Sequence, residues 1–372
     1  MKKKLPKISV IIPVRPGEKT IKAIESLRRV AYPANLIEIF ICFGFNPSKQ
    51  RNEGVKKARG EILYFLDNDS EPERQAFRRT VNAFFGRMTP VKLAYVRGFS
   101  LLPGWFSNLI VETLFSRAIY RGEIGVIGGP NIWVKEESFW SSMAGIIFES
   151  FFASLKMSSR WRPIGDCRRV DEKELILCNL AVRRDVFKEV GGFNETLYPN
   201  EENELLYRID KLGYQLVYHP GVLVFRPRRE SFKKILKTFF HYGRGRMENV
   251  KVAGFLPSLP LFLPLVLLGY LVGLVFYCVA TSFAFHPWFA FIPLILYLGM
   301  GFGSALGFAA RRRKAYLAIF LPPLFLIAHL SYAFGLIHGL VTDLEKRKQR
   351  GIKEKIKVVK LKGFGKNWNI LT

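Results

Sequence analysis

Two aspartates separated by one residue end an apolar run in the stretch GEILYFLDNDS, from Gly60 to Ser70. Alternate carboxylates at the end of a buried strand, here Asp67 and Asp69, can share one divalent cation such as Mg²⁺ or Mn²⁺. Asp, Asn and Ser also favour turns, so the motif taken alone fits a simple turn equally well. The elements around the motif have to decide between these interpretations.

A second acidic group lies in the stretch EENEL, from Glu201 to Leu205. The surrounding residues predict a helix that begins near Glu201, and the helix dipole favours carboxylates in a first turn. That effect explains one carboxylate more readily than three in four residues. A carboxylate that the helix does not need can act as a general base, which removes a proton from a hydroxyl group.

Strands and helices that alternate along the N-terminal half must position both acidic groups. Apolar runs at residues 8–14, 36–43 and 61–66 predict strands buried on both faces, with helices between them. This order predicts a parallel α/β sheet, whose ligands gather at the carboxyl ends of the strands. Asp67 and Asp69 would lie at that edge, which favours a binding role. Further strands are expected at 125–133, within 174–183 and as a closing pair within 214–229.

Charge and hydropathy set the C-terminal third apart. The 372 residues include 57 Lys and Arg against 30 Asp and Glu, a net charge of +27, yet residues 255–310 contain none of these four types. Apolar segments at 261–284, 288–310 and 315–341 are each long enough to cross a bilayer, which takes about 20 residues. The basic residues border these segments and form no patch interleaved with aromatic residues. Their position favours anionic lipid as a partner and argues against nucleic acid.

Basic residues also predict an orientation in the membrane. Residues 226–251 and the RRRK loop at 311–314 favour the cytoplasmic side, so we expect an integral protein of the cell membrane with a cytoplasmic N-terminal domain. Three crossings would then place the basic tail outside. Either one apolar segment does not cross, with Pro322–Pro323 and residues 255–264 as suspects, or the tail is translocated.

The sequence thus predicts four regions: an α/β domain at 1–230, an amphipathic helix and linker at 231–254, about three transmembrane helices at 255–342 and a basic tail at 343–372. The amphipathic helix carries apolar residues at helical spacing between lysines, a pattern typical of a helix in the membrane interface. A helix packed on the sheet would have the same pattern. His329 and His338 are expected to form hydrogen bonds between helices, and the four cysteines are expected to be reduced.

The order of these motifs resembles the membrane-bound family 2 glycosyltransferases. The resemblance rests on SVIIPV, QRNEGVKKARGEILYFLDNDS, CNLAVRRDVFKEVGGFNE and EENELLYRI, followed by a basic segment and C-terminal membrane segments. It covers residues 8–250 by motif and the remainder by architecture. It implies a GT-A catalytic domain, which is a Rossmann-like α/β fold with a mostly parallel sheet, followed by an all-α transmembrane region. It also implies a nucleotide-sugar donor.

The resemblance also implies roles for particular residues. Asp69 would bind a Mg²⁺ or Mn²⁺ ion directly, and Asp67 would lie nearer the ribose or a metal-bound water. Glu202 falls on the position of the base, with Glu201 beside it as the alternative. The other residues implied to bind the nucleotide sugar are Pro13, Arg15, Arg51, Asn52, Arg244 and Arg246. Arg51 could equally be a solvated charge on the surface of a helix. Arg244 and Arg246 could equally anchor the protein to lipid headgroups instead of binding phosphate.

Three departures from the family pattern bear on function. Relatives end the second strand on an aspartate that reads the nucleotide base, whereas this chain has Phe43 and Gly44. Arg15–Pro16 follows the first strand in place of Tyr-Asn or Arg-Asn. The Gln-x-x-Arg-Trp motif of processive synthases is replaced by HYGRGR at 241–246, which argues against processive synthesis.

These observations predict a metal-dependent, non-processive, hexosyltransferase-like enzyme of polysaccharide or glycolipid biosynthesis. Its acceptor would be a lipid-linked or polysaccharide molecule near the membrane, and one base without a nucleophile implies inversion of configuration. The alternative is a membrane-anchored binding or scaffold protein on a degenerate transferase fold, which the altered second strand supports. The presence of both acidic groups favours the enzyme. The sequence does not predict the sugar, the nucleotide base or the oligomeric state.

Overall fold

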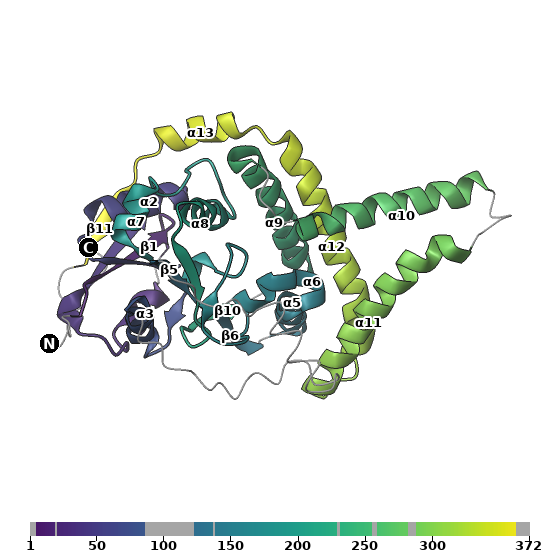
Figure 1. Cartoon of the computed structure of the whole chain (residues 1–372), viewed down its shortest axis with the longest axis horizontal. Coiled ribbons are helices and arrows are strands. Elements are labelled where there is room, and N and C mark those ends of the chain that lie inside the picture. Colours follow the sequence, from purple (N-terminus) through teal and green to yellow (C-terminus); the bar gives the residue numbers. More distant parts are fainter. Residues whose placement is uncertain are drawn as a thin grey trace.

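An eight-stranded sheet forms the centre of the N-terminal domain (Figure 1). The structure is a computed structural model that describes residues 5–18, 21–85, 123–136, 138–228, 231–254, 259–281 and 288–361. The sheet order is β11-β2-β1-β3-β8-β5-β9-β7. The strands are β1 (Ile8–Val14), β2 (Ile37–Phe43), β3 (Ile62–Phe65), β5 (Ile124–Gly128), β7 (Arg168–Arg169), β8 (Leu180–Arg183), β9 (Gln215–Tyr218) and β11 (Lys357–Lys360). Strands β1, β2, β3, β5 and β9 run in one direction, so the sheet is mixed and mostly parallel, as predicted.

Helices cover both faces of this sheet because its central strands are apolar on both faces. Alternate residues of β1 enter different cores: Ile8, Val10 and Ile12 lie on one side and Ile11 on the other. The first core packs against α1 (Lys22–Leu27) and α3 (Ala76–Phe84). The second packs against α2 (Pro47–Lys57), α7 (Arg184–Glu189) and α8 (Glu201–Lys211). Helix α8 begins at Glu201, as the sequence predicted.

A smaller sheet lies beside the carboxyl end of β3. It consists of β4 (Glu71–Pro72), β10 (Val224–Arg228) and β6 (Asn131–Glu136), in the order β4-β10-β6. The expected closing pair of β9 and β10 is wrong, because the two strands belong to different sheets. Strands β5 and β9 are neighbours in the large sheet, and the segments after them turn together, at 129–130 and at 219–221. Strands β6 and β10 therefore leave the large sheet side by side and pair in parallel.

Three long apolar helices follow the domain. They are α10 (Leu263–Ala280), α11 (Ile292–Arg312) and α12 (Leu317–Val341), and the segments 259–280, 288–312 and 317–341 are long and apolar enough to span a membrane. Helices α10 and α11 project away from the domain, whereas α12 runs along it (Figure 1). In its most apolar stretch, α10 has 6% of its residues buried within the protein, α11 has 11% and α12 has 39%. Helix α12 is therefore the one most covered by the rest of the protein.

The amphipathic helix is α9 (Phe232–Ala253), and it packs on α12 with their backbones almost in contact. A Cβ atom added to Gly243 would lie 2.0 Å from the carbonyl oxygen of Tyr332, and one added to Gly335 would lie 2.0 Å from that of Phe240. The apolar face of α9 was expected to lie among acyl chains, and this expectation is wrong for two of its residues. Ile235 and Phe239 are buried inside the protein, because α12 and α5 (Phe139–Glu149) cover them.

The two histidines of α12 behave differently. His329 shares a hydrogen bond of 2.8 Å with the hydroxyl group of Tyr297 on α11, so the expected bond between helices is confirmed. His338 instead lies 3.3 Å from the hydroxyl group of Thr342, one turn further along the chain. Its expected bond to another helix is therefore replaced by a local one.

The C-terminal segment returns to the N-terminal domain. Helix α13 (Leu344–Lys353) leads to β11, which pairs antiparallel with β2 from Lys357 opposite Phe43 to Lys360 opposite Phe40. The partly buried Ile356 and Val358 pack against the second core. A segment expected as a basic tail thus supplies an edge strand of the sheet.

Candidate active site

Asp67 and Asp69 lie just beyond the carboxyl end of β3, at the edge of the sheet where the sequence placed them. The antiparallel pairing of β4 with β10 sets Glu71 opposite Phe225, which brings Arg226 beside the turn that carries both aspartates. One guanidinium group bridges the two carboxylates: Arg226 Nη1 is 3.1 Å from Asp67 Oδ2, and Nη2 is 2.8 Å from Asp69 Oδ1. The two aspartates therefore have the geometry to share a single cation.

Arg51 joins this pair to the second acidic group. Its Nη2 is 3.0 Å from Asp67 Oδ1, and its Nη1 is 2.9 Å from Glu201 Oε1. The residue lies on α2 and is only 4% exposed, so a solvated charge on a helix is excluded. A buried arginine needs carboxylate partners to offset its desolvation, and Asp67 and Glu201 supply them.

Glu201 and Glu202 are the first two residues of α8, and α9 holds the loop that precedes them. Asn249 Nδ2 donates to the carbonyl oxygen of Asn200, and Asn200 Nδ2 donates to that of Tyr242, both at 3.0 Å. Both glutamates are buried. Burial raises the pKa of Glu201 to about 7, and the charge of Glu202 adds to this rise while Arg51 opposes it. Glu201 can therefore hold a proton near neutral pH.

Glu202 has a cation of its own. Its Oε1 lies 3.3 Å from Nη1 of Arg160, a buried residue outside the sequence motifs. The Arg160 guanidinium also donates to the side chain of Asn203 at 2.6 Å and to the carbonyl oxygens of Glu172 and Lys173 at 2.9 and 2.6 Å. Arg160 is therefore fixed in place, and it orients Glu202 from the side opposite Arg51 and the aspartates.

Three other residues expected to bind the donor form no hydrogen bond or ion pair with these aspartates, glutamates and arginines in the described part of the chain. Asn52 binds the loop after α7, accepting from the backbone of Phe193 at 3.0 Å and donating to its carbonyl oxygen at 2.9 Å. Pro13 is half-buried, and Arg15 is exposed just after β1.

The two arginines of α9 contact the domain. Arg244 Nη2 donates to the carbonyl oxygen of Tyr198 at 2.9 Å. Arg246 is fully buried, with Nη1 3.5 Å from Glu172 Oε1, which excludes a lipid-headgroup anchor for that residue. It lies on the Arg160 side of the site, because Glu172 is common to both arginines.

Sequence reasoning missed Arg226 and Arg160. Arg226 was counted only as part of the basic run 226–251, although its place on a strand two residues after a buried valine, Val224, was a usable signal. Arg160 has no comparable signal, because it ends a short 3₁₀ helix, Leu155–Arg160, whose place beside Glu202 depends on tertiary packing.

The end of β2, where relatives carry an aspartate, is covered by the C-terminal segment. A Cβ atom added to Gly44 would lie 2.5 Å from Ile356 Cδ1 and 2.7 Å from Glu354 Oε1. Lys49 Nζ donates to the carbonyl oxygen of Glu354 at 2.8 Å. A larger residue at this position would have to displace the side chains of Ile356 and Glu354, and Glu354 brings a carboxylate here.

A divalent ion fits the aspartate pair on chemical grounds. The residues that the structure describes contain no group of three or more His, Cys, Asp or Glu that could enclose a metal. Two carboxylates that already share one guanidinium can share an ion if Arg226 moves aside, and hard divalent ions accept oxygen ligands from phosphate and water as well. The pair therefore suits an ion that a phosphorylated ligand helps to hold.

Comparison with known proteins finds similarity to glycosyltransferases. Residues 43–89 match the model of "Glycosyl transferase family 2". The succinoglycan biosynthesis protein ExoA of Rhizobium meliloti is 29% identical over 171 residues, which are 45% of this chain and 48% of that protein. The probable glycosyltransferase YdaM of Bacillus subtilis is 21% identical over 281 residues, 67% of this chain and 57% of its own. The chain thus spans about half the length of the curated relatives it matches.

Among solved structures, the chain is similar to a mannosyltransferase from Pyrobaculum calidifontis in complex with GDP-Man and Mn²⁺, with 14% identity and a TM-score of 0.46 over 91% of this chain and 88% of that one. It is also similar to residues 1–349 of TarS from S. aureus in complex with UDP-GlcNAc, with 14% identity and a TM-score of 0.38 over 93% and 92% of the two chains.

Proposed function

We propose that the N-terminal domain is a family 2 glycosyltransferase and that the protein transfers a sugar from a nucleotide-sugar donor to a lipid-linked or polysaccharide acceptor at a membrane surface. The observation that carries the proposal is a row of alternating charges: Asp69, Arg226, Asp67, Arg51 and Glu201. It joins a place suited to a diphosphate with a pair of glutamates at the start of α8.

The aspartate end of the row would receive the donor. Arg226 is 27% exposed, so its guanidinium can turn from the carboxylates toward an arriving diphosphate, whose oxygens suit its paired donors. When bound, a Mg²⁺ or Mn²⁺ ion would be held by Asp69 and Asp67 and would offset the negative charge of the departing nucleoside diphosphate. Arg51 stays in place, because its buried ion pair with Glu201 and its partly buried pair with Asp67 would have to break for it to move.

The glutamate end would activate the acceptor. In our proposal Glu202 takes the proton of the acceptor hydroxyl while that oxygen bonds to the anomeric carbon and the bond from this carbon to the diphosphate breaks. Direct displacement with one base and no covalent intermediate inverts the configuration. Glu201 is the weaker candidate, because Arg51 ties it to Asp67 on the donor side.

We also propose a membrane arrangement that places the domain and the C-terminal segment together. Because β11 pairs with β2, both lie on the same side of the membrane, and the number of crossings must be even. Helices α10 and α11 are the least buried and project as a hairpin, so they would cross, while α12 stays beside α9 on the side of the domain. Basic residues at 311–314 and 346–360 then all face the domain's side, which would be the cytoplasm.

The donor class can be tested by thermal unfolding of the purified full chain. A panel of UDP-, GDP- and dTDP-sugars is compared with and without Mn²⁺ or Mg²⁺. We expect one nucleotide class to raise the unfolding temperature, with a larger rise when the ion is present. If none of the panel does so for the wild-type protein, the proposed function is refuted.

A further inference from the structure

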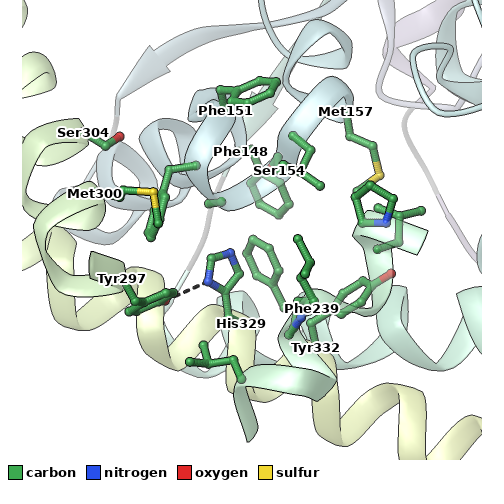
Figure 2. Close-up of a pocket in the computed structure, with 18 of the residues that line it drawn as sticks. Phe148, Phe151, Ser154, Met157, Phe239, Tyr297, Met300, Ser304, His329 and Tyr332 are labelled. Carbon is green, nitrogen blue, oxygen red and sulfur yellow. Dashed lines mark hydrogen bonds between the residues drawn. The ribbon is translucent and has the colours of Figure 1, made fainter. Parts of the chain in front are cut away.

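A large apolar cavity lies between the domain and the long helices. Its volume is about 900 Å³, in the range of pockets that enclose one drug-sized molecule. Figure 2 shows side chains from several elements that converge on it, among them Phe148, Phe239 and Tyr332. The hydrogen bond between Tyr297 and His329 closes part of its wall. Its lining is almost entirely aromatic and aliphatic, so its occupant should be a hydrocarbon.

The cavity opens sideways between the two projecting helices. Val266 on α10 and Met300 on α11 both line it, yet they are 65% and 60% exposed on the helix surface. The lining comes from the first half of α10 and from almost the whole length of α11, from Pro293 to Arg311. A hydrocarbon chain could therefore enter from the bilayer between these two helices without crossing water.

Three arginines line the cavity: Arg160, Arg162 and Arg311. The Nε of Arg162 is buried and donates no hydrogen bond to any described residue, and burial lowers the pKa of this side chain, an effect that Glu149 opposes. Arg311 lies over the ring of Phe308, 4.7 Å from its centroid, and Nε donates to the carbonyl oxygen of Gly307 at 3.1 Å. In the part of the chain that the structure describes, neither forms an ion pair. Two cations beside an apolar cavity call for an anionic ligand.

One arginine of the lining contacts the candidate base. Arg160 lines the cavity and contacts Glu202 at 3.3 Å, so a molecule anchored between the other two arginines would extend past Arg160 toward Glu202. A ligand with a hydrocarbon chain, an anionic group and a sugar in that order matches the apolar lining, the arginines and the glutamate in the same order.

We infer that this cavity is the acceptor site and takes a single-chain lipid phosphate, with the chain between α10 and α11, the phosphate at Arg162 and Arg311, and the attached sugar directed to Glu202. The inference rests on the proposed function for the role of the lipid, although binding of the lipid can be measured without any transfer. The volume suits one chain better than the two chains of a glycerophospholipid.

The test uses the purified full chain in detergent and geranylgeranyl phosphate as the probe, with binding followed by native mass spectrometry. Gly303 lines the cavity, whereas Gly299, one turn earlier on α11, does not. A Cβ atom added at either position meets nothing within 4 Å. Gly303→Phe therefore fills the cavity, and Gly299→Phe is its matched control. The double variant Arg162→Gln with Arg311→Gln removes the cations, and Arg313→Gln, just after the end of α11 and outside the cavity lining, is its control. We expect both cavity variants to bind the probe at least about tenfold more weakly than the wild type. The phenylalanine removes space for the chain, and the double variant removes charged hydrogen bonds to the phosphate.

Binding equal to wild type in both cavity variants would overturn the inference. Equal binding of geranylgeraniol would show that the phosphate is not recognised, and tighter binding of dioleoyl phosphatidic acid would show that a two-chain lipid is the occupant. Thermal stabilisation by the nucleotide sugar is measured on the same samples. Its absence in the wild type would refute the proposed function while the lipid result still stands on its own, and its retention in the variants shows that they are folded.

Discussion

Arg226 occupies the place between Asp67 and Asp69 that a divalent ion would take, so the two cations should compete. The variant Arg226→Gln removes the charge and keeps a side chain of similar length that can still form a hydrogen bond. We expect this variant to bind Mn²⁺ more tightly than the wild type when no nucleotide is present. In contrast, it should bind a nucleoside diphosphate more weakly when no metal is present, because the guanidinium is then the main partner of the phosphates.

The size of the effect follows from the two contacts. Arg226 makes charged hydrogen bonds to Asp67 at 3.1 Å and to Asp69 at 3.0 Å, and bonds of this kind contribute about 1.5–3 kcal/mol each. The guanidinium and both carboxylates are 27–37% exposed, and solvent reduces such pairs considerably. We therefore take the lower end for a single bond, about 1.5 kcal/mol, as the value for the whole group, which corresponds to a Kd for Mn²⁺ about tenfold lower.

Isothermal titration calorimetry of Mn²⁺ into the nucleotide-free protein measures this directly. The matched control is Arg79→Gln, since Arg79 is also partly exposed and also pairs with one carboxylate, Glu73 at 2.7 Å, on α3 away from the site. The control should leave the Kd for Mn²⁺ unchanged. An unchanged or higher Kd in Arg226→Gln would refute the idea that the arginine and the ion share one place.

Three further outcomes are expected. Glu202→Gln should abolish turnover while the Kd for the donor changes little, because a base acts on the acceptor; a matching loss of donor affinity, seen by calorimetry, would make Glu202 a donor ligand. The pKa of Glu201 is raised from 4.5 to about 7 in the folded protein, so between these pH values the folded state binds a proton that the unfolded state has lost. The free energy of unfolding should therefore fall as pH rises through this window, by up to about 3 kcal/mol from this group. Denaturant unfolding of Glu201→Gln across the window should therefore show a smaller fall than the wild type, and an equal fall would contradict the assignment. A cysteine placed at Lys355 should react with a membrane-impermeant maleimide only when the face of the membrane that carries the domain is exposed. A cysteine placed at Lys57 on α2 should react from the same face, and labelling of the two from opposite faces would contradict the even number of crossings.

The acidic groups could be located from the sequence because local patterns determine their positions. A buried strand that ends on Asp67 places that residue at an edge of the sheet, and a helical pattern that starts at Glu201 places two carboxylates in a first turn. Both depend on periodicity and on end effects within about ten residues of chain. The same reasoning placed the start of helix α9 to within one residue, although the helix runs on through the expected linker to Ala253.

The partners of those groups could not be located, since they depend on pairing between distant segments. Arg226 reaches Asp69 only because β10 pairs with β4, about 150 residues away in the chain, and Arg160 reaches Glu202 from the end of a short 3₁₀ helix. The return of the C-terminal segment to β2 was also missed, because the sequence KVVK reads as part of a basic tail. The basic composition describes its charge, while the two valines supply its strand character and its contact with the core.

The most direct test of the account is whether the protein transfers sugar through the row of charges. Release of nucleoside diphosphate is followed with the donor identified by thermal unfolding, Mn²⁺ and a membrane lipid extract as acceptor, for the wild type, Asp69→Asn and the remote variant Arg79→Gln. We predict release by the wild type and by Arg79→Gln, and none by Asp69→Asn although it unfolds at a similar temperature. Full release by Asp69→Asn in EDTA, or none by the wild type with any donor, would contradict the account.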